Sequence, residues 1–298
     1  MTVSKFTEFA NDVTNQIIQE LEKGNVVWKQ PWKNLGRCRN LLTKSSYSGF
    51  NLFYLNWKME QRGFKTPHFM TFQQARSIGA SVKKGAKSIQ VIYWKNFSSE
   101  STEEIQITKY VRLHPFVHFV FNIDDIDNID PKYLPINDSE EQSIHTIEDC
   151  ELLINNFHNL AEIRHGGDRA FYTPSHDFIQ VPNINQFSSS EKYYSTLFHE
   201  IIHSTGHKSR LDRFSENVLP AKFGSDDYSK EELVAEIGAT FLNAQCGIKE
   251  HVFEASVAYI KNWMKVLKED PKLIITASSN AQKAFTYLFQ KEEIEILA

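Results

Sequence analysis

Apolar residues recur at three- and four-residue steps over residues 4–23, which predicts an amphipathic helix at the start of the chain. Phe6, Val13 and Leu21 would share its buried face, and Gly24 supplies the signal that ends it. The polar face carries acidic and amide side chains rather than lysines. The helix is therefore unlike those that lie on membrane surfaces.

The same patterns predict the other elements of the first 122 residues. Helical spacing of apolar residues indicates two more helices, at 51–62 and from 71 to near Gly79. Runs rich in aromatic and β-branched residues indicate strands at 88–95, 105–107 and 116–122, with a polar loop after the first. This part of the chain is predicted to be an α+β domain with three helices and a small antiparallel sheet.

Residues 123–143 differ in character, because acidic residues alternate with Pro131 and Pro135. We interpret this stretch as an acidic linker between domains. Beyond it, five helices are expected, at 145–163, 191–206, 229–246, 252–269 and 273–290. One pair of strands is expected, at 170–172 and 178–181. The sequence thus predicts an α+β protein of two domains, 1–122 and 144–298, of which the second is mostly helical with a small sheet.

The charge of the chain is divided unevenly between these two parts. Residues 1–122 contain 17 Lys and Arg against 8 Asp and Glu, whereas the remainder contains 16 against 29, within an overall net charge of −4. A basic half is a candidate for binding nucleic acid. The alternative is that the two halves simply attract one another.

Cysteine content and hydropathy limit where the protein works. The three cysteines, Cys38, Cys150 and Cys246, are odd in number and widely spaced, which argues against disulfides and for the reducing cytoplasm. No apolar run approaches the length of a membrane span, and residues 1–6 lack the apolar core of a signal peptide. We therefore expect a cytoplasmic protein with no membrane partner.

Aromatic and basic residues are interleaved in three loops of the basic half. Rings stack on unpaired bases and cations contact phosphates, so this combination favours single-stranded DNA over a duplex. For any one tryptophan a place in the core is the simpler explanation, but four of the five tryptophans lie in this half. The candidate DNA-binding residues are Trp28, Trp32, Arg37, Arg39, Tyr47, Asn51, Lys83, Lys84 and Lys87.

The sequence His199-Glu200-Ile201-Ile202-His203 has the form H-E-x-x-H. On a helix, His199 and His203 would lie one turn apart on one face, where both imidazoles can bind one Zn²⁺ beside Glu200 as general base. The alternative is a core helix with two hydrogen-bonded histidines.

A catalytic zinc needs a third protein ligand, and the helix expected from Ser229 offers Glu232 and Glu236 on one face. A cation would explain acidic residues on an otherwise apolar helix, since unpaired buried carboxylates are costly. Ser229 and Glu232 also form a capping box, which by itself accounts for Glu232 but leaves Glu236 unexplained.

The stretch Glu232-Leu233-Val234-Ala235-Glu236 resembles the E-x-x-[SA]-[DE] half-motif of thermolysin-like gluzincin metallopeptidases. The resemblance implies that Glu232 is the third zinc ligand and that Glu236 hydrogen-bonds the ring of His199 from outside the metal shell. The metzincin pattern fits less well, because Ser209 stands where its third histidine would fall.

Over nearly its whole length the sequence resembles ArdC-type antirestriction proteins of mobile elements. The matching stretches are 24–32, 47–51, 71–75, 82–85, 177–182, 199–211, 231–236 and 281–284. The resemblance implies an N-terminal domain that binds single-stranded DNA, a C-terminal zincin-like metallopeptidase domain and protection of incoming plasmid DNA from restriction. The partners expected are single-stranded DNA and an unidentified protein substrate.

As a peptidase, the site would use Glu200 to take a proton from a zinc-activated water and pass it to the leaving nitrogen. His207 and Tyr228 are candidate oxyanion donors by their closeness in sequence. One strand of the pair at 170–172 and 178–181 would offer a free edge to the substrate peptide. The alternative function is a non-catalytic protein that binds single-stranded DNA and whose zinc is structural.

Overall fold

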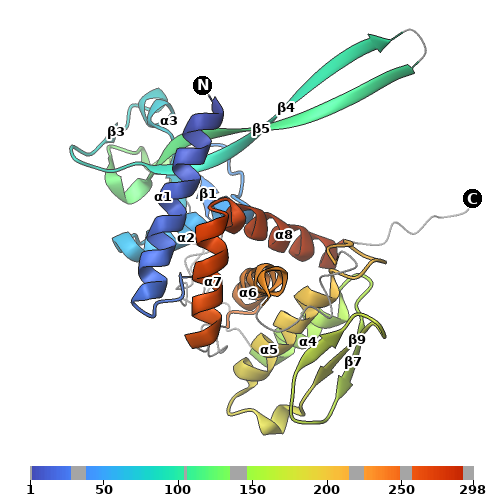
Figure 1. Cartoon of the computed structure of the whole chain (residues 1–298). Helices are drawn as coiled ribbons and strands as arrows, with labels where there is room; N and C mark the ends of the chain where they lie inside the picture. The colour runs from blue at the N-terminus through green and yellow to red at the C-terminus, as the bar shows by residue number, and fades with distance from the viewer. Residues whose placement is uncertain are drawn as a thin grey trace, which may run out of the picture.

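The structure is a computed structural model that describes residues 2–27, 38–103, 106–134, 146–214, 225–248 and 257–290. Its N-terminal part has helices on a four-stranded sheet of order β1-β2-β5-β4 (Figure 1). The elements are α1 (Thr2–Glu22), β1 (Arg39–Asn40), α2 (Gly49–Arg62), β2 (His68–Met70), α3 (Phe72–Ser77), β4 (Ile89–Glu103) and β5 (Gln106–Asn122). A separate two-stranded sheet pairs β3 (Ser81–Val82) with β6 (Ile126–Asp127).

Strands β4 and β5 form a hairpin that is far longer than the sequence predicts (Figure 1). Their antiparallel register is unbroken from Ile89 opposite Val120 to Glu103 opposite Gln106. The polar residues that we expected to form a loop instead extend both strands. The pairing is made by backbone groups, so polar residues do not interrupt it.

In the residues that the structure describes, the C-terminal part has five α-helices and a three-stranded sheet of order β7-β9-β8. The helices are α4 (Thr146–Asn155), α5 (Ser190–Ser204), α6 (Asp226–Gln245), α7 (Val257–Glu269) and α8 (Leu273–Leu288). The strands are β7 (Glu162–His165), β8 (Phe171–Thr173) and β9 (Phe178–Val181). The predicted fold class is confirmed, but β7 was missed, and the helix expected over 145–163 ends at Asn155 before it.

One hydrophobic core runs through both parts of the molecule. It joins α1 and α2 of the N-terminal part to α7 and α8 of the C-terminal part (Figure 1). Two hydrogen bonds cross the junction, from Thr14 Oγ1 to the carbonyl of Pro271 at 2.7 Å and from the Gly49 amide to Gln282 Oε1 at 3.0 Å. The two parts therefore pack against one another through a shared core.

A smaller core lies on the other side of the N-terminal sheet, between α3 and the β3–β6 pair. Ile123 and Ile126, from the stretch predicted as the start of the linker, are buried there with Met70 and Ala75. The boundaries at 122 and 143 remain a prediction. Among the described residues, no helix is long and apolar enough to cross a membrane.

Candidate metal centre

Helix α5 carries the H-E-x-x-H sequence in its last two turns. Ser189 caps its first turn by accepting a hydrogen bond from the Lys192 amide. His199, Glu200 and His203 are all buried. The neighbouring apolar residues of α5 pack into the core, so the helix presents its polar face to α6.

Close packing of α5 against α6 brings the acidic residues of α6 to this face. Gly238 lies where a side chain would come within 2.9 Å of three carbon atoms of Ile202. Without a side chain at this position, the two helices approach closely enough for Glu232 and Glu236 to reach the histidines. Any larger residue at position 238 would push the helices apart.

Three buried side chains converge as metal ligands. The Nε2 atoms of His199 and His203 are 3.1 Å apart, and each lies 3.4 Å from an oxygen of Glu232. Their ligand atoms all lie within 4.8 Å of one another. Two ligands of a tetrahedral zinc, each about 2.0–2.1 Å from the ion, would be roughly 3.3–3.4 Å apart. The donor set and its spacing therefore fit a divalent metal with two imidazoles and one carboxylate.

Each histidine has a second carboxylate at its other ring nitrogen. Glu236 Oε1 lies 3.5 Å from His199 Nδ1, the partnership that the gluzincin resemblance implied. Glu231 Oε1 lies 3.4 Å from His203 Nδ1, and we did not predict this contact. Carboxylates in these positions fix which nitrogen of each ring faces the metal. The signal in the sequence that could have indicated Glu231 is that it is an acidic residue directly before Glu232.

Arg213 holds Glu231 in place from the loop after α5. Its guanidinium donates to both oxygens of Glu231, at 2.7 and 3.3 Å, and both side chains are less than a tenth exposed. It also donates to Thr205 Oγ1 at 2.7 Å and to the Ile202 carbonyl at 2.8 Å, both near the end of α5. A single arginine thus connects the C-terminal end of α5 to the carboxylate behind His203.

In the metal-free chain, these groups shift one another's pKa values. Burial by itself lowers the pKa of His203, but its hydrogen bonds to Glu231 and Glu232 outweigh burial and raise the pKa to about 10. For His199, the contact with Glu232 likewise overcomes burial and raises the pKa. Burial opposes ionisation of Glu232, yet the two histidines hold its pKa well below the usual range. The metal-free site is a cluster of ion pairs.

We expect metal affinity to rise with pH and binding to release protons. A cation must displace the proton of His203, whose pKa of about 10 keeps that ring charged at neutral pH. Conversely, the ion pair of His203 with Glu232 stabilises the metal-free fold fully between the ordinary pKa values of 4.5 and 6.5, and that contribution is lost as the pH rises toward about 10. Calorimetric titration in buffers of different ionisation enthalpy measures the protons released. An affinity independent of pH between about 6 and 9 would contradict this assignment.

Glu200 is buried beside the ligands and faces strand β8. Burial raises its pKa, while the neighbouring histidines and a hydrogen bond from the Tyr172 backbone oppose the rise. Tyr172 is the middle residue of β8, which forms an edge of its sheet and packs against α5. Of the two predicted strands, β8 is thus the one at an edge of the sheet as far as the structure describes it, whereas β9 lies in the middle.

The two candidate oxyanion donors lie on different elements. His207 follows α5, where its Nδ1 is 2.7 Å from Ser209 Oγ and 3.9 Å from Asp177 Oδ2. Tyr228 lies in the first turn of α6, four residues before Glu232 and so on the same face of that helix. The role of each as an oxyanion donor remains a prediction.

The predicted DNA-binding residues lie in different settings. Arg39, Lys84 and Lys87 are exposed. Lys83 is also exposed, but its amine donates to the Asp124 carbonyl at 2.8 Å. Three predicted residues lie outside the described part of the chain, namely Trp28, Trp32 and Arg37.

Tyr47 and Asn51 make contacts within the fold. The ring of Tyr47 packs edge-on against Phe69, with centroids 6.1 Å apart, and burial raises the pKa of its hydroxyl. The carboxamide of Asn51 donates to the Ile92 carbonyl at 2.7 Å and accepts from the Ile92 amide at 2.8 Å, which ties α2 to β4. These contacts give both residues a structural role, whether or not DNA binds near them.

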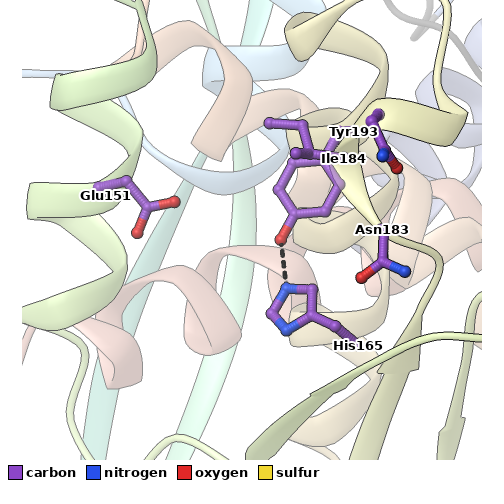
Figure 2. Close-up of a pocket in the computed structure, with 6 residues that line it drawn as sticks. Glu151, His165, Asn183, Ile184 and Tyr193 are labelled. Carbon is purple, nitrogen blue, oxygen red and sulfur yellow. Dashed lines mark hydrogen bonds between the residues drawn. The ribbon is translucent and has the colours of Figure 1, made fainter.

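A pocket of about 440 Å³ adjoins the N-terminal half of α5 (Figure 2). Tyr193 and His165 point toward one another within it, 2.8 Å apart between the hydroxyl and Nε2. Glu151 of α4 lies across the pocket from them. Asn183 and Ile184 are the other lining residues labelled in Figure 2. No motif in the sequence indicates this pocket.

Comparison with known proteins assigns both parts of the chain. Residues 148–280 match the family model of a zincin-like metallopeptidase, and residues 7–125 match that of the N-terminal domain of the anti-restriction factor ArdC. The metal-free crystal structure of the antirestriction protein ArdC from plasmid R388 superposes with a TM-score of 0.72 at 32% identity, over 95% of this chain and 99% of that one. The Mn(II)-bound structure of the same protein gives a TM-score of 0.70 at 32% identity, over 93% and 96%.

Curated relatives extend the comparison. The DNA primase TraC of Escherichia coli is 36% identical over 96% of this chain, which spans only 28% of the primase. The uncharacterized protein y4eC of Sinorhizobium fredii (strain NBRC 101917 / NGR234) is 28% identical over 96% of this chain and 93% of its own length. Fold and site together define a two-part protein with a zincin-like domain and a divalent-metal site. The chain belongs to the ArdC family of antirestriction proteins.

Proposed function

We propose that this protein is an antirestriction factor that binds single-stranded DNA and hydrolyses peptide bonds at a zinc site. The observation that carries the peptidase half is the convergence of His199, His203 and Glu232 beside the buried carboxyl of Glu200. Two imidazoles and a glutamate are a ligand set that catalytic zinc uses. The bound ion would activate a water and polarise the substrate carbonyl.

Glu200 moves the proton in this proposal. Its carboxylate accepts a proton from the attacking water and returns it to the nitrogen that leaves. Burial raises its pKa, so the protonated form that must donate is less costly to reach than for an exposed glutamate. The Tyr172 amide holds the carboxylate from the side of β8.

The substrate we propose is an extended polypeptide that pairs with the free edge of β8. Among the described strands, residues 171–173 pair with β9 alone, and β8 also contacts α5. An extended chain can add to such an edge through backbone hydrogen bonds, which places a peptide bond near Glu200 without requiring a particular sequence.

The DNA half of the proposal rests on charge. Residues 38–95 contain ten Lys and Arg and a single acid, Glu60. Lysine and arginine side chains bind phosphates. The affinity for a labelled oligothymidylate should therefore fall steeply as the salt concentration is raised. The three cysteines are free and buried, which suits the reducing cytoplasm that we propose as the place of action.

Removal of the metal separates this proposal from a purely structural metal site. Chelation should abolish cleavage of a denatured protein substrate, and equimolar zinc should restore it, because Glu200 needs an activated water to act on. Gel-based cleavage, thermal melting and oligothymidylate binding are measured on the same samples. Glu232→Ala serves as the variant that lacks a ligand. If the metal-loaded protein cleaves nothing while chelation lowers only the melting temperature, the metal is structural.

A further inference from the structure

Two phenylalanines on the basic part of the molecule expose their rings to solvent. Phe72 is 50% exposed at the first position of α3, and Phe119 is 53% exposed on β5. A single exposed aromatic residue is ordinary on a protein surface. Two that lie together on a charged surface need an explanation.

These two residues lie near the junction of β2, α3 and β5. Met70, the last residue of β2, lies opposite Phe121 of β5 in an antiparallel pair. Phe72 begins α3 two residues after Met70, and Phe119 stands two residues before Phe121 on β5, the strand that α3 contacts. Helix α3 packs against β5 at this point, beside the base of the long hairpin (Figure 1).

A basic residue flanks one of these rings. Arg76 is exposed and lies four residues after Phe72, on the same face of α3. On the other side, Phe119 lies opposite Gln90 of β4, a polar residue that is partly exposed. The only acid between residues 38 and 95 is Glu60. A negatively charged partner with flat apolar groups complements this surface.

We propose that Phe72 and Phe119, flanked by Arg76, form a stacking surface for unpaired bases of single-stranded DNA. The inference rests on the proposed binding of single-stranded DNA and names residues that carry it. Each ring stacks on one base, and Arg76 contacts a neighbouring phosphate. The bases of a duplex are already stacked on one another, so this surface favours single strands.

The test compares oligothymidylate binding by the full chain and by Phe72→Ala/Phe119→Ala. Stacking on two rings predicts that the double variant binds a labelled oligothymidylate of about 16 nucleotides at least roughly tenfold more weakly. Phe72→Tyr/Phe119→Tyr keeps both rings and should bind like the wild type. Phe289→Ala, which removes a 39% exposed ring after the end of α8, is the matched control and should also leave affinity unchanged.

An oligonucleotide of abasic residues separates stacking from phosphate contacts. The wild type and the double alanine variant should bind it with equal affinity, whereas Arg76→Gln should reduce the salt dependence of binding to both oligonucleotides. Equal binding of oligothymidylate by the wild type and a folded double alanine variant overturns the stacking surface, and indicates that these rings serve a protein partner or none. If the wild type itself does not bind single strands, the proposed DNA-binding function fails as well.

Discussion

Glu200→Gln is expected to reduce peptide-bond cleavage by about 10²–10⁴-fold while metal content and DNA binding stay unchanged. Glutamine has the shape of the buried glutamate and can still accept from the Tyr172 amide, so the local structure should persist. What it cannot do is take a proton from water. The loss would therefore lie in the chemical step.

The measurement is the rate of cleavage of a denatured protein substrate, with zinc content determined on the same preparation. Glu151→Gln is the matched control, because Glu151 is an exposed carboxylate whose contact is the Tyr194 hydroxyl. Cleavage by Glu200→Gln at the wild-type rate would show that this residue is not the base. Loss of zinc from Glu200→Gln would show that Glu200 contributes to metal binding rather than to proton transfer.

Arg213→Ala is expected to lower the free energy of unfolding by about 3–5 kcal/mol, because it leaves the buried Glu231 carboxylate without its guanidinium partner. It should also weaken zinc binding about 10–100-fold, since Glu231 would no longer be held against His203. Chemical denaturation measures the first effect, and competition with a chromophoric chelator measures the second.

A double variant distinguishes the two effects of Arg213→Ala. Adding Glu231→Gln removes the unpaired charge, so Arg213→Ala/Glu231→Gln should regain part of the lost stability but not the lost affinity for zinc. Arg164→Ala breaks an exposed pair with Glu162 and should change neither quantity. If the double variant is as unstable as Arg213→Ala alone, the cost does not come from a buried charge.

The sequence was sufficient to predict which side chains converge at the candidate metal centre, because their geometry is local to two helices. His199 and His203 are one turn apart on α5, and Glu232 and Glu236 are one turn apart on α6, so helical spacing alone puts each pair on one face. Helical spacing does not predict whether the two helices lie against one another. That depends on Gly238 lying against Ile202, a contact between residues 36 positions apart that no periodicity reveals.

Features that depend on distant contacts were missed for the same reason. Arg213 is separated from Glu231 by 18 positions, and its loop carries no recognisable pattern. Asn51 is a polar residue at the end of a loop-like stretch, which suggested a binding residue. In the structure, the nitrogen and the oxygen of its carboxamide both hydrogen-bond the backbone of Ile92. The predicted hairpin is shorter than the observed one because the polar residues after 95 indicate a loop. Cross-strand pairing, however, needs no apolar residue at every position.

The core shared by α1 and α2 with α7 and α8 has a consequence for how this protein is inherited. A gene cut at the predicted boundary would yield two fragments, each with an apolar face that water would contact. Recombination that separates the N-terminal part from the zincin-like part would therefore expose this apolar face on both fragments. In the primase TraC, the segment that is 36% identical to this chain covers 96% of it, so both parts occur together in that longer protein.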